Sequence, residues 1–138
     1  MMRVLFDTNI VLDVLLARFS WHVEAGAIFQ AARKGKLDGA VTTLSIANIF
    51  YVGRRLAGLD KARVAVRDCL DAFDVLPIDR HTLEAALAMQ GSDFEDDIQI
   101  AAATQAGLDA IVTRDPTGFA ASHIPAYSPA ELLARVEV

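Results

Sequence analysis

The segment "RVLFD", residues Arg3 to Asp7, has the composition of a short buried β-strand that ends at a carboxylate. The segment "AIVTRD", residues 110–115, repeats this arrangement late in the chain and ends at Asp115. In open α/β sheets, ligands bind beyond the carboxyl ends of the strands, near the point where the strand order reverses. If the two strands are neighbours at that point, Asp7 and Asp115 meet in one crevice.

Around these two segments, short apolar runs of strand length alternate with longer runs of helical spacing. This alternation predicts a parallel sheet with helices on both faces, joined by right-handed crossovers. We therefore expect a three-layer α/β/α sandwich with a central parallel sheet of about five strands, and residues 1–138 as a single domain. The expected strands cover residues 3–6, 40–43, 75–78, 110–113 and 124–127. The expected helices cover residues 9–16, 21–34, 44–56, 61–73, 81–90 and 92–106, with a last helix opening at 128–131.

Local signals set the expected ends of several elements. Gly35 and Gly39 are expected to bracket a turn. Asp60 and Asp79 are expected to cap the helices that follow them, because aspartate is a favoured N-cap residue. The segment "SPAE", residues 128–131, combines a capping box with proline at the first helical position, which predicts the start of the last helix.

Composition and charge narrow the function classes. The 138 residues are 54% hydrophobic and contain no uncharged apolar run long enough to cross a membrane. Asp7, Asn9 and Asp13 interrupt the apolar start, which argues against a signal peptide. The single cysteine, Cys69, is expected to be a buried inert thiol in a reducing cytoplasm. The net charge of −5 excludes a generally basic nucleic-acid surface but allows basic residues around an acidic centre.

The segment "SDFEDDIQIAAA", residues 92–103, places four carboxylates at the start of an apolar helix. Helix capping accounts for part of this charge, because Ser92 and Glu95 have the spacing of a capping box and acids suit the first turn. Asp96 and Asp97 lie deeper, and both sides of the helix are apolar beyond the first turn. The helical wheel places Asp96 almost opposite the side that carries Phe94, which favours Asp96 over Asp97 only weakly. A carboxylate buried there is costly unless it is paired or binds a metal.

Asp7, Asp96 and Asp115 could therefore form a pocket of three carboxylates. Such carboxylates repel one another, and without a cation at least one should stay protonated. Mg²⁺ or Mn²⁺ would relieve the repulsion, because hard cations prefer oxygen ligands. Two simpler explanations remain open, namely a plain helix cap at residues 7–9 and an ordinary turn at residues 115–118.

Three segments together resemble the PIN-domain ribonucleases, many of which are VapC-like toxins of bacterial type II toxin–antitoxin pairs. They are "VLFDTNIVLD" (residues 4–13), "DFEDDIQIAAA" (93–103) and "IVTRDPTGF" (111–119), in the family's order and spacing, and the resemblance covers essentially the whole chain. It implies that Asp7, Asp96 and Asp115 bind Mg²⁺ (or Mn²⁺), with Asn9 holding the Asp7 carboxylate by hydrogen bonds. It also implies hydrolysis of RNA phosphodiester bonds by a metal-activated water. A cognate antitoxin, a homodimer and a cytoplasmic location follow from the same resemblance.

One position departs from the family's pattern. The segment "TTLSIANIFYV", residues 42–52, carries Asn48 where the family usually has a glutamate as its second acid. Asparagine can bind a metal through its carbonyl oxygen but brings no charge. Three consequences are open: Glu95 supplies the missing carboxylate, the metal affinity is lower, or activity is lost. A subgroup of PIN-like proteins looks similar in combining this asparagine with "DFED". The alternative function is a catalytically silent PIN-like module that binds RNA or protein.

Other residues and folds carry weaker signals. A response-regulator receiver would need a lysine near a late strand, and "TRD" (residues 113–115) has none. A haloacid-dehalogenase-like phosphatase would need a second acid two residues after Asp7, where Asn9 stands. The histidines His22, His81 and His123 show no metal-ligand spacing. Trp21 and Phe29 are expected in the core or at a dimer surface rather than in a base-stacking platform. The candidate phosphate contacts are Arg3, Arg54, Arg55 and Arg114.

Overall fold

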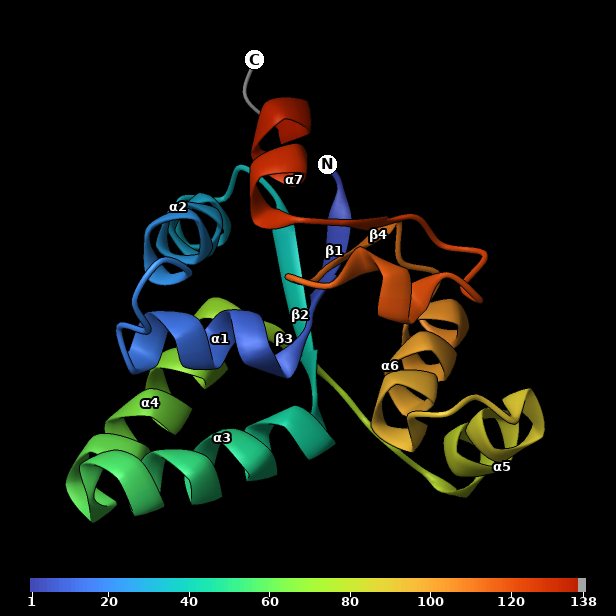
Figure 1. Cartoon of the computed structure of the whole chain (residues 1–138), viewed down its shortest axis with the longest axis horizontal. Helices are drawn as coiled ribbons and strands as arrows, with labels where there is room; N and C mark the ends of the chain where they lie inside the picture. Colours follow the sequence, from blue (N-terminus) through green and yellow to red (C-terminus); the bar gives the residue numbers. More distant parts are fainter. Residues whose placement is uncertain (137–138) are drawn as a thin grey trace.

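A parallel sheet of five strands lies at the centre of the computed structural model, which describes residues 1–136 (Figure 1). The strands lie in the order β3-β2-β1-β4-β5. From β1 the chain moves outward through β2 and β3, and it then returns to place β4 on the other side of β1. The strand order therefore reverses between β1 and β4. The strands are β1 (Arg3–Phe6), β2 (Asp38–Thr42), β3 (Asp74–Leu76), β4 (Ala110–Val112) and β5 (Ala126–Tyr127).

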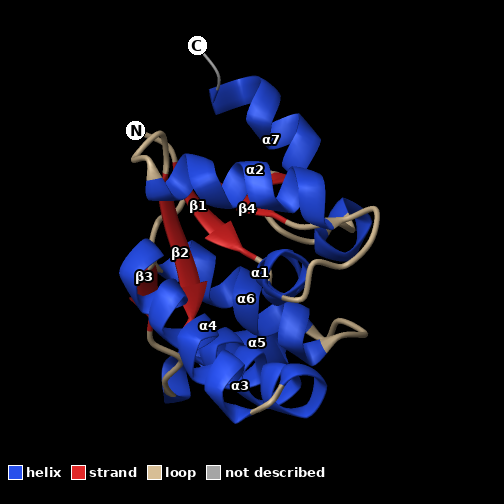
Figure 2. Cartoon of the chain, turned by 90° about the vertical axis from the view of Figure 1, so that its left-hand side faces the viewer, coloured by secondary structure: helices blue, strands red, loops and turns tan. Residues whose placement is uncertain are grey.

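Helices cover both faces of the sheet and complete three layers, as the alternating pattern predicts (Figures 1 and 2). One face packs against α1 (Thr8–Leu15), α2 (His22–Arg33), α3 (Thr43–Ala57), α4 (Leu59–Ala72) and α7 (Pro129–Val136). The other face packs against α6 (Phe94–Gln105) and the short 3₁₀ helix η1 (Pro116–Phe119), and α5 (Arg80–Met89) lies outside α6. No helix within residues 1–136 is long and apolar enough to cross a membrane.

The alternation of side chains along β1 divides the core between the two faces. Val4 and Phe6 point into the larger core, whereas Leu5 joins the core beneath α6. The ring of Phe6 contacts that of Phe73 at 4.7 Å between centroids, and Phe73 meets Phe29 edge-on at 5.2 Å. The packed side chains of the larger core, Val4, Phe6, Phe29 and Phe73, are all buried. This packing fixes the position of the carboxyl end of β1.

Two predicted helix starts are wrong, and both errors have a local cause. The carboxylate of Asp93, rather than Ser92, caps α6 by accepting a hydrogen bond from the Asp96 N–H at 3.1 Å. Helix α4 begins at Leu59, one residue before the expected cap Asp60, because Gly58 adopts a φ of 93° and turns the chain directly from α3 into α4. The caps predicted at Asp79 and at residues 128–131 are confirmed.

Gly39 does not bracket a turn, as the sequence suggested, but lies within β2. A Cβ atom at this position would lie 2.7 Å from the ring of Phe73. The glycine is therefore needed for the close approach of an aromatic side chain. Cys69 is buried as expected, and burial raises the pKa of its thiol to about 12, so the thiol stays protonated at neutral pH.

Candidate functional site

The two acids that follow strands lie beside each other at the switch point of the sheet. Asp7 directly follows β1, and its N–H donates a hydrogen bond to the Val112 carbonyl at 3.0 Å. This bond extends the pairing of β1 with β4 by one residue. Asp7 is therefore adjacent to the loop that carries Thr113 and Asp115, as the sequence analysis expected for neighbouring strands.

The Asp7 carboxylate is held in one orientation from two sides. Gln99 Nε2 donates to its Oδ1 at 2.9 Å, and Thr113 Oγ1 donates to its Oδ2 at 2.9 Å. The same Thr113 oxygen accepts the N–H of Asp115 at 3.2 Å. Asn9 was expected to hold this carboxylate, and that expectation is wrong: its side-chain oxygen instead accepts a hydrogen bond from Arg18 at 3.4 Å.

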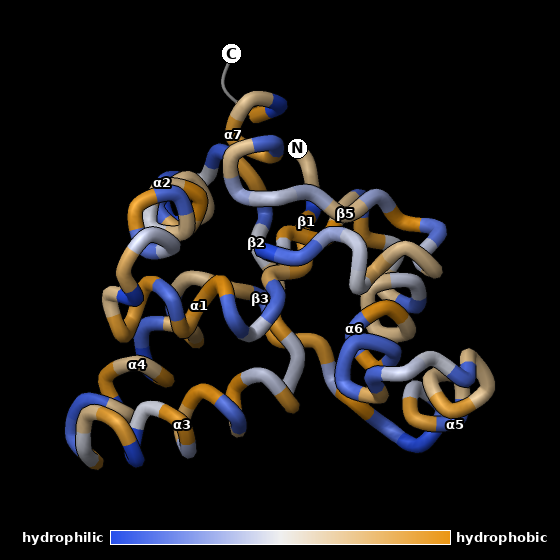
Figure 3. The backbone as a smooth tube through the Cα atoms, in the orientation of Figure 1, coloured by the Kyte–Doolittle hydropathy of each residue, from blue (hydrophilic) through white to orange (hydrophobic). Residues whose placement is uncertain are grey.

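Asp96 and Asp115 face each other across Gly118. A Cβ atom built on Gly118 would lie 3.3 Å from Asp96 Oδ2 and 3.4 Å from Asp115 Oδ2. The other Asp115 oxygen accepts a hydrogen bond from the Thr117 hydroxyl. Because no side chain projects from residue 118, the space between the two carboxylates stays open. The start of α6 appears as a hydrophilic segment in Figure 3, in contrast to the hydrophobic strands beside it.

The electrostatics of Asp96 reflect this crowding. Burial and the nearby carboxylates, those of Asp93 and Asp7 foremost, raise its pKa to about 7. Asp96 is therefore only partly ionised at neutral pH in the absence of a cation, as expected for acids that repel one another. The raised pKa is also typical of functional sites, where burial and like charge meet.

Glu95 is connected to the position where the family's second acid is absent. Asn48 on α3 donates from Nδ2 to Glu95 Oε1 at 3.2 Å, and the Thr8 hydroxyl donates to the same oxygen at 3.4 Å. Thr8 in turn shares a hydrogen bond of 2.6 Å with Ser45. Asn48 and Glu95, together with Thr8 and Ser45, thus form one hydrogen-bonded polar group that joins three helices, α1, α3 and α6.

The donor set at this edge of the sheet fits a hard divalent cation that keeps part of its water. Within residues 1–136, no group of three His, Cys, Asp or Glu side chains is arranged to hold a metal directly. Mg²⁺, however, usually binds through one or two carboxylates and retains several waters. The oxygen-only set of Asp7, Asp96 and Asp115 meets that requirement. Gln99 Oε1, buried beside Asp7, has no hydrogen-bond partner among the described residues, so the site also contains an unused acceptor.

Comparison with protein families agrees with this arrangement. Residues 3–117 match the family described as the PIN domain.

The chain belongs to the PIN domain family.

Solved structures show the same fold over nearly the full length of this PIN domain. A toxin–antitoxin complex from Klebsiella pneumoniae is 24% identical, with a TM-score of 0.67, and the alignment covers 91% of this chain and 97% of that one. VapC20 from Mycobacterium tuberculosis, a sarcin–ricin loop cleaving toxin, is 15% identical with a TM-score of 0.70, covering 86% and 94%. DNA-bound VapBC from Salmonella typhimurium is 15% identical with a TM-score of 0.70, covering 94% and 99%. No curated protein matches the chain in sequence.

Two of the predicted phosphate contacts of this PIN domain need revision. Arg3 lies at the amino end of β1, where its guanidinium donates to the Ala106 carbonyl at 3.0 Å. It is therefore at the opposite edge of the sheet from the carboxylates, and the prediction of a contact at the site is wrong. Arg114 lies next to Asp115 but is engaged by a buried carboxylate, that of Asp13, at 3.4 Å. Arg54 and Arg55 lie in the last turn of α3 and stay predictions.

Asp13 is a part of the site that sequence reasoning missed. It is fully buried on α1 and forms ion pairs with Arg114 at 3.4 Å and with Arg18 at 3.5 Å. Burial nevertheless raises its pKa, because the loss of hydration outweighs the attraction of the two arginines. The sequence signal was a charged residue inside an otherwise apolar helix. Gln99 and Thr113 carried the same kind of signal, since each is polar in an apolar run.

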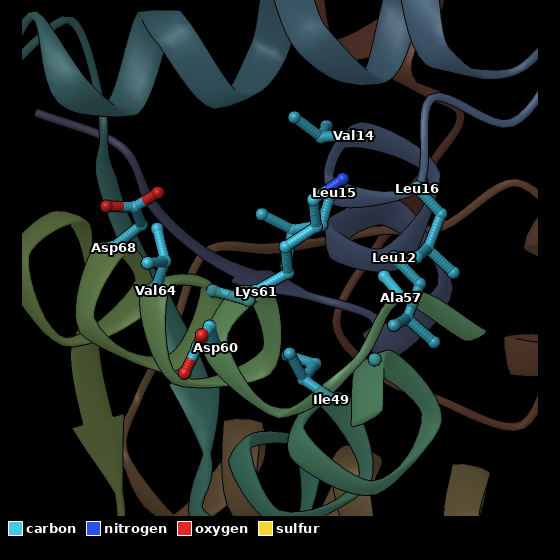
Figure 4. Close-up of a pocket in the computed structure, with 12 residues that line it drawn as sticks. Leu12, Val14, Leu15, Leu16, Ile49, Ala57, Asp60, Lys61, Val64 and Asp68 are labelled. Carbon is cyan, nitrogen blue, oxygen red and sulfur yellow. The ribbon is translucent and has the colours of Figure 1, made fainter. Parts of the chain in front are cut away.

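A second surface feature of the PIN domain is an apolar groove of about 490 Å³ between α1, α3 and α4 (Figure 4). Apolar residues form most of its wall, and the charged groups of Asp60, Lys61 and Asp68 line it as well. The groove does not share a lining residue with the carboxylate site. Its apolar lining residues are Leu12, Val14, Leu15, Leu16, Ile49, Gly53, Ala57, Val64 and Ala65.

Proposed function

We propose that this PIN domain is a divalent-metal-dependent ribonuclease that hydrolyses RNA phosphodiester bonds and acts as the toxin of a toxin–antitoxin pair. One observation supports the proposal: at the edge where the strand order reverses, Thr113 hydrogen-bonds both Asp7 and Asp115, and the carboxylates of Asp96 and Asp115 lie on either side of Gly118. Hydrolysis of RNA is a reaction in which such an acidic centre, loaded with a cation, is chemically suited to act. Cytoplasmic location and homodimer formation remain predictions of the family resemblance.

The residues would share the work as follows. Asp7, Asp96 and Asp115 would hold Mg²⁺ or Mn²⁺, and Glu95 would add the carboxylate that the family's second acid supplies elsewhere. A bound cation supplies acidification of a water and neutralises charge on the phosphodiester. Gln99 and Thr113 fix the Asp7 carboxylate before any cation arrives, so little reorganisation is needed on binding. Asn48 orients Glu95 from the neighbouring helix.

A catalytically silent module is the second candidate, because Asn48 removes one charge from the expected ligand set. Metal titration of the purified chain separates the two functions. For the ribonuclease we expect millimolar Mg²⁺ or Mn²⁺ to raise the melting temperature by about 5–10 °C at a hundredfold excess over Kd, and single-stranded RNA to be cleaved only with the metal. Ca²⁺ and EDTA serve as controls. If neither metal produces a thermal shift or RNA cleavage, the silent module is favoured.

An antitoxin helix is the partner we propose for the apolar groove. The groove offers an apolar floor with charged sides, which suits the apolar face of an amphipathic helix. The structure of similar fold from Klebsiella pneumoniae is described as a toxin–antitoxin complex, which agrees with such a partner.

Substitution of the groove wall tests this partner. Val64→Glu should weaken binding of a co-expressed antitoxin by at least about tenfold, because an unpaired carboxylate would be buried against apolar groups. Binding is measured by calorimetry with the product of a short antitoxin-like reading frame beside this gene. Leu70→Glu on the same helix is the matched control, because Leu70 is exposed and does not line the groove. Equal affinity for both variants would contradict the groove as the docking site.

A further inference from the structure

The loop between α1 and α2 presents two aromatic side chains to solvent. Phe19 is 89% exposed and Trp21 is 47% exposed. The guanidinium of Arg114 lies over the Trp21 ring, 4.9 Å from its centroid. We refer to Phe19, Trp21 and Arg114 as the aromatic surface. Trp21 was expected in the core or at a dimer surface, but about half of it remains accessible, whereas Phe29 is buried as expected.

The backbone of this loop is held in an unusual conformation. Ala17 and Ser20 have φ angles of 47° and 68°, which residues with a Cβ atom rarely adopt. The loop is nevertheless well connected, since the N–H groups of Arg18 and Trp21 donate to the carbonyls of Asp13 and Arg18 at 3.0 and 3.2 Å. Strain that persists in an ordered loop is typical of functional sites. Here the two positive-φ residues flank the exposed side chain of Phe19.

Charge pairs tie the aromatic surface to the carboxylate site. Arg114, which stacks on Trp21, is the residue before Asp115 and is bound to Asp13 at 3.4 Å. Arg18 of the loop binds the same Asp13 at 3.5 Å. A hollow of about 230 Å³ lies beside Trp21 and Arg114 and is also lined by Asp13 and Glu24. Trp21 is therefore connected through Arg114 to the residue that precedes Asp115.

We propose that the aromatic surface stacks an unpaired nucleobase of the RNA, next to the phosphodiester held at the carboxylates. This inference rests on the proposed ribonuclease function. Asp13 and Glu24 offset the charges of Arg18 and Arg114, and the chain as a whole carries a net charge of −5. Phosphate attraction alone is therefore a poor source of affinity, whereas stacking on an aromatic ring flanked by arginine needs no excess positive charge. Bases are available for such stacking in single strands and loops, not inside a duplex.

Intrinsic fluorescence gives a direct test, because Trp21 is the only tryptophan in the chain. The full-length protein is titrated in Ca²⁺ without Mg²⁺ or Mn²⁺, so that a cation is present at the carboxylates while cleavage is prevented. The two ligands are a single-stranded adenylate hexamer and an abasic hexamer of equal charge. We expect quenching of Trp21 by the hexamer with bases, weakly dependent on salt, and none by the abasic strand. Equal responses to both strands, or no response to either, would overturn the proposal.

Steady-state cleavage gives a second, independent readout. Phe19→Ala and Trp21→Ala should each raise KM for single-stranded RNA by about tenfold and leave kcat nearly unchanged, since neither side chain touches the carboxylates. Leu70→Ala is the matched control: Leu70 is 55% exposed, close to the value of Trp21, but lies beside Asp38, at the amino end of β2.

The outcomes separate this proposal from the proposed function. Unchanged KM for both variants would overturn stacking while leaving the ribonuclease intact. Unchanged KM together with an altered sedimentation coefficient would assign the surface to a protein interface instead. If the wild type cleaved no RNA under any metal condition, the proposed function would fail, and the fluorescence titration would still decide whether bases stack on Trp21.

Discussion

Replacing Asp7 with asparagine should abolish metal-dependent RNA cleavage and leave the fold intact. The change removes one negative charge from the centre, and the loss of a metal ligand should cost several kcal/mol of transition-state stabilisation, on the order of a thousandfold in rate. The fold should survive, because asparagine has nearly the same shape and its amide can donate to Thr113, whose hydroxyl can also accept. Cleavage of a labelled single-stranded RNA in Mg²⁺, with circular dichroism and a melting curve, measures both effects.

Asp38→Asn is the matched control, because Asp38 is exposed at the amino end of β2, on the opposite edge of the sheet. It should retain full activity. Glu95→Gln provides an intermediate case: if Glu95 supplies the second acid, cleavage should fall, and the Mg²⁺ concentration for half-maximal rate should rise. A fully active Asp7→Asn protein would show that the carboxylate site does not catalyse the cleavage.

Asp96→Asn should change stability and activity in opposite directions. Without metal, the ionised Asp96 is destabilised by burial and by neighbouring carboxylates, which raise its pKa to about 7. Asparagine removes this repulsion, so the variant should be more stable than the wild type at pH 8, by on the order of 1–2 kcal/mol after allowing for partial exposure. With saturating Mg²⁺ the order should reverse, because only the wild type binds the cation tightly.

The pH dependence gives this prediction its sign. The folded-state pKa of Asp96 lies above its unfolded value of 3.8. The folded protein therefore loses stability as the pH rises from about 4 to about 7, and it loses no further stability from this group above pH 7. The gain from Asp96→Asn should therefore be absent near pH 4 and complete above pH 7, as urea unfolding in EDTA would measure. Asp93→Asn keeps the helix cap and serves as the control, with a smaller gain and retained activity. If the free energy of unfolding of Asp96→Asn equalled that of the wild type at every pH, the proposed repulsion of Asp96 by its neighbouring carboxylates would be contradicted.

The parts of the site that sequence could predict are those set by local pattern. Asp7 and Asp115 follow short apolar strands, and the order of such strands in α/β folds places their ends together. The apolar sides of the helix beyond its first turn favoured Asp96 only weakly over Asp97, and the family resemblance placed the third acid at Asp96. The structure agrees, since Ile98 faces α5 and Ile100 faces the sheet.

The hydrogen-bond partners could not be predicted in the same way, because they depend on where distant side chains end. Asn9 lies two residues from Asp7 but is drawn to Arg18, and the partners of Asp7 come instead from α6 and from the end of β4. The ion-pair partners of Asp13 likewise come from two separate loops, which carry Arg18 and Arg114. The helix starts at Phe94 and Leu59 differ from expectation for a different reason. Asp93 instead of its neighbour Ser92 caps α6, and Gly58, which has no side chain to accept a hydrogen bond, occupies the N-cap position of α4.

The bond between Asp7 and Thr113 joins residues 106 positions apart. During synthesis, the ribosome must release the chain through Asp115 before the three acids can gather, since β4 has no place in the sheet until then. A nascent or prematurely terminated product that lacks β4 carries Asp7 without its companions and should be harmless to cellular RNA.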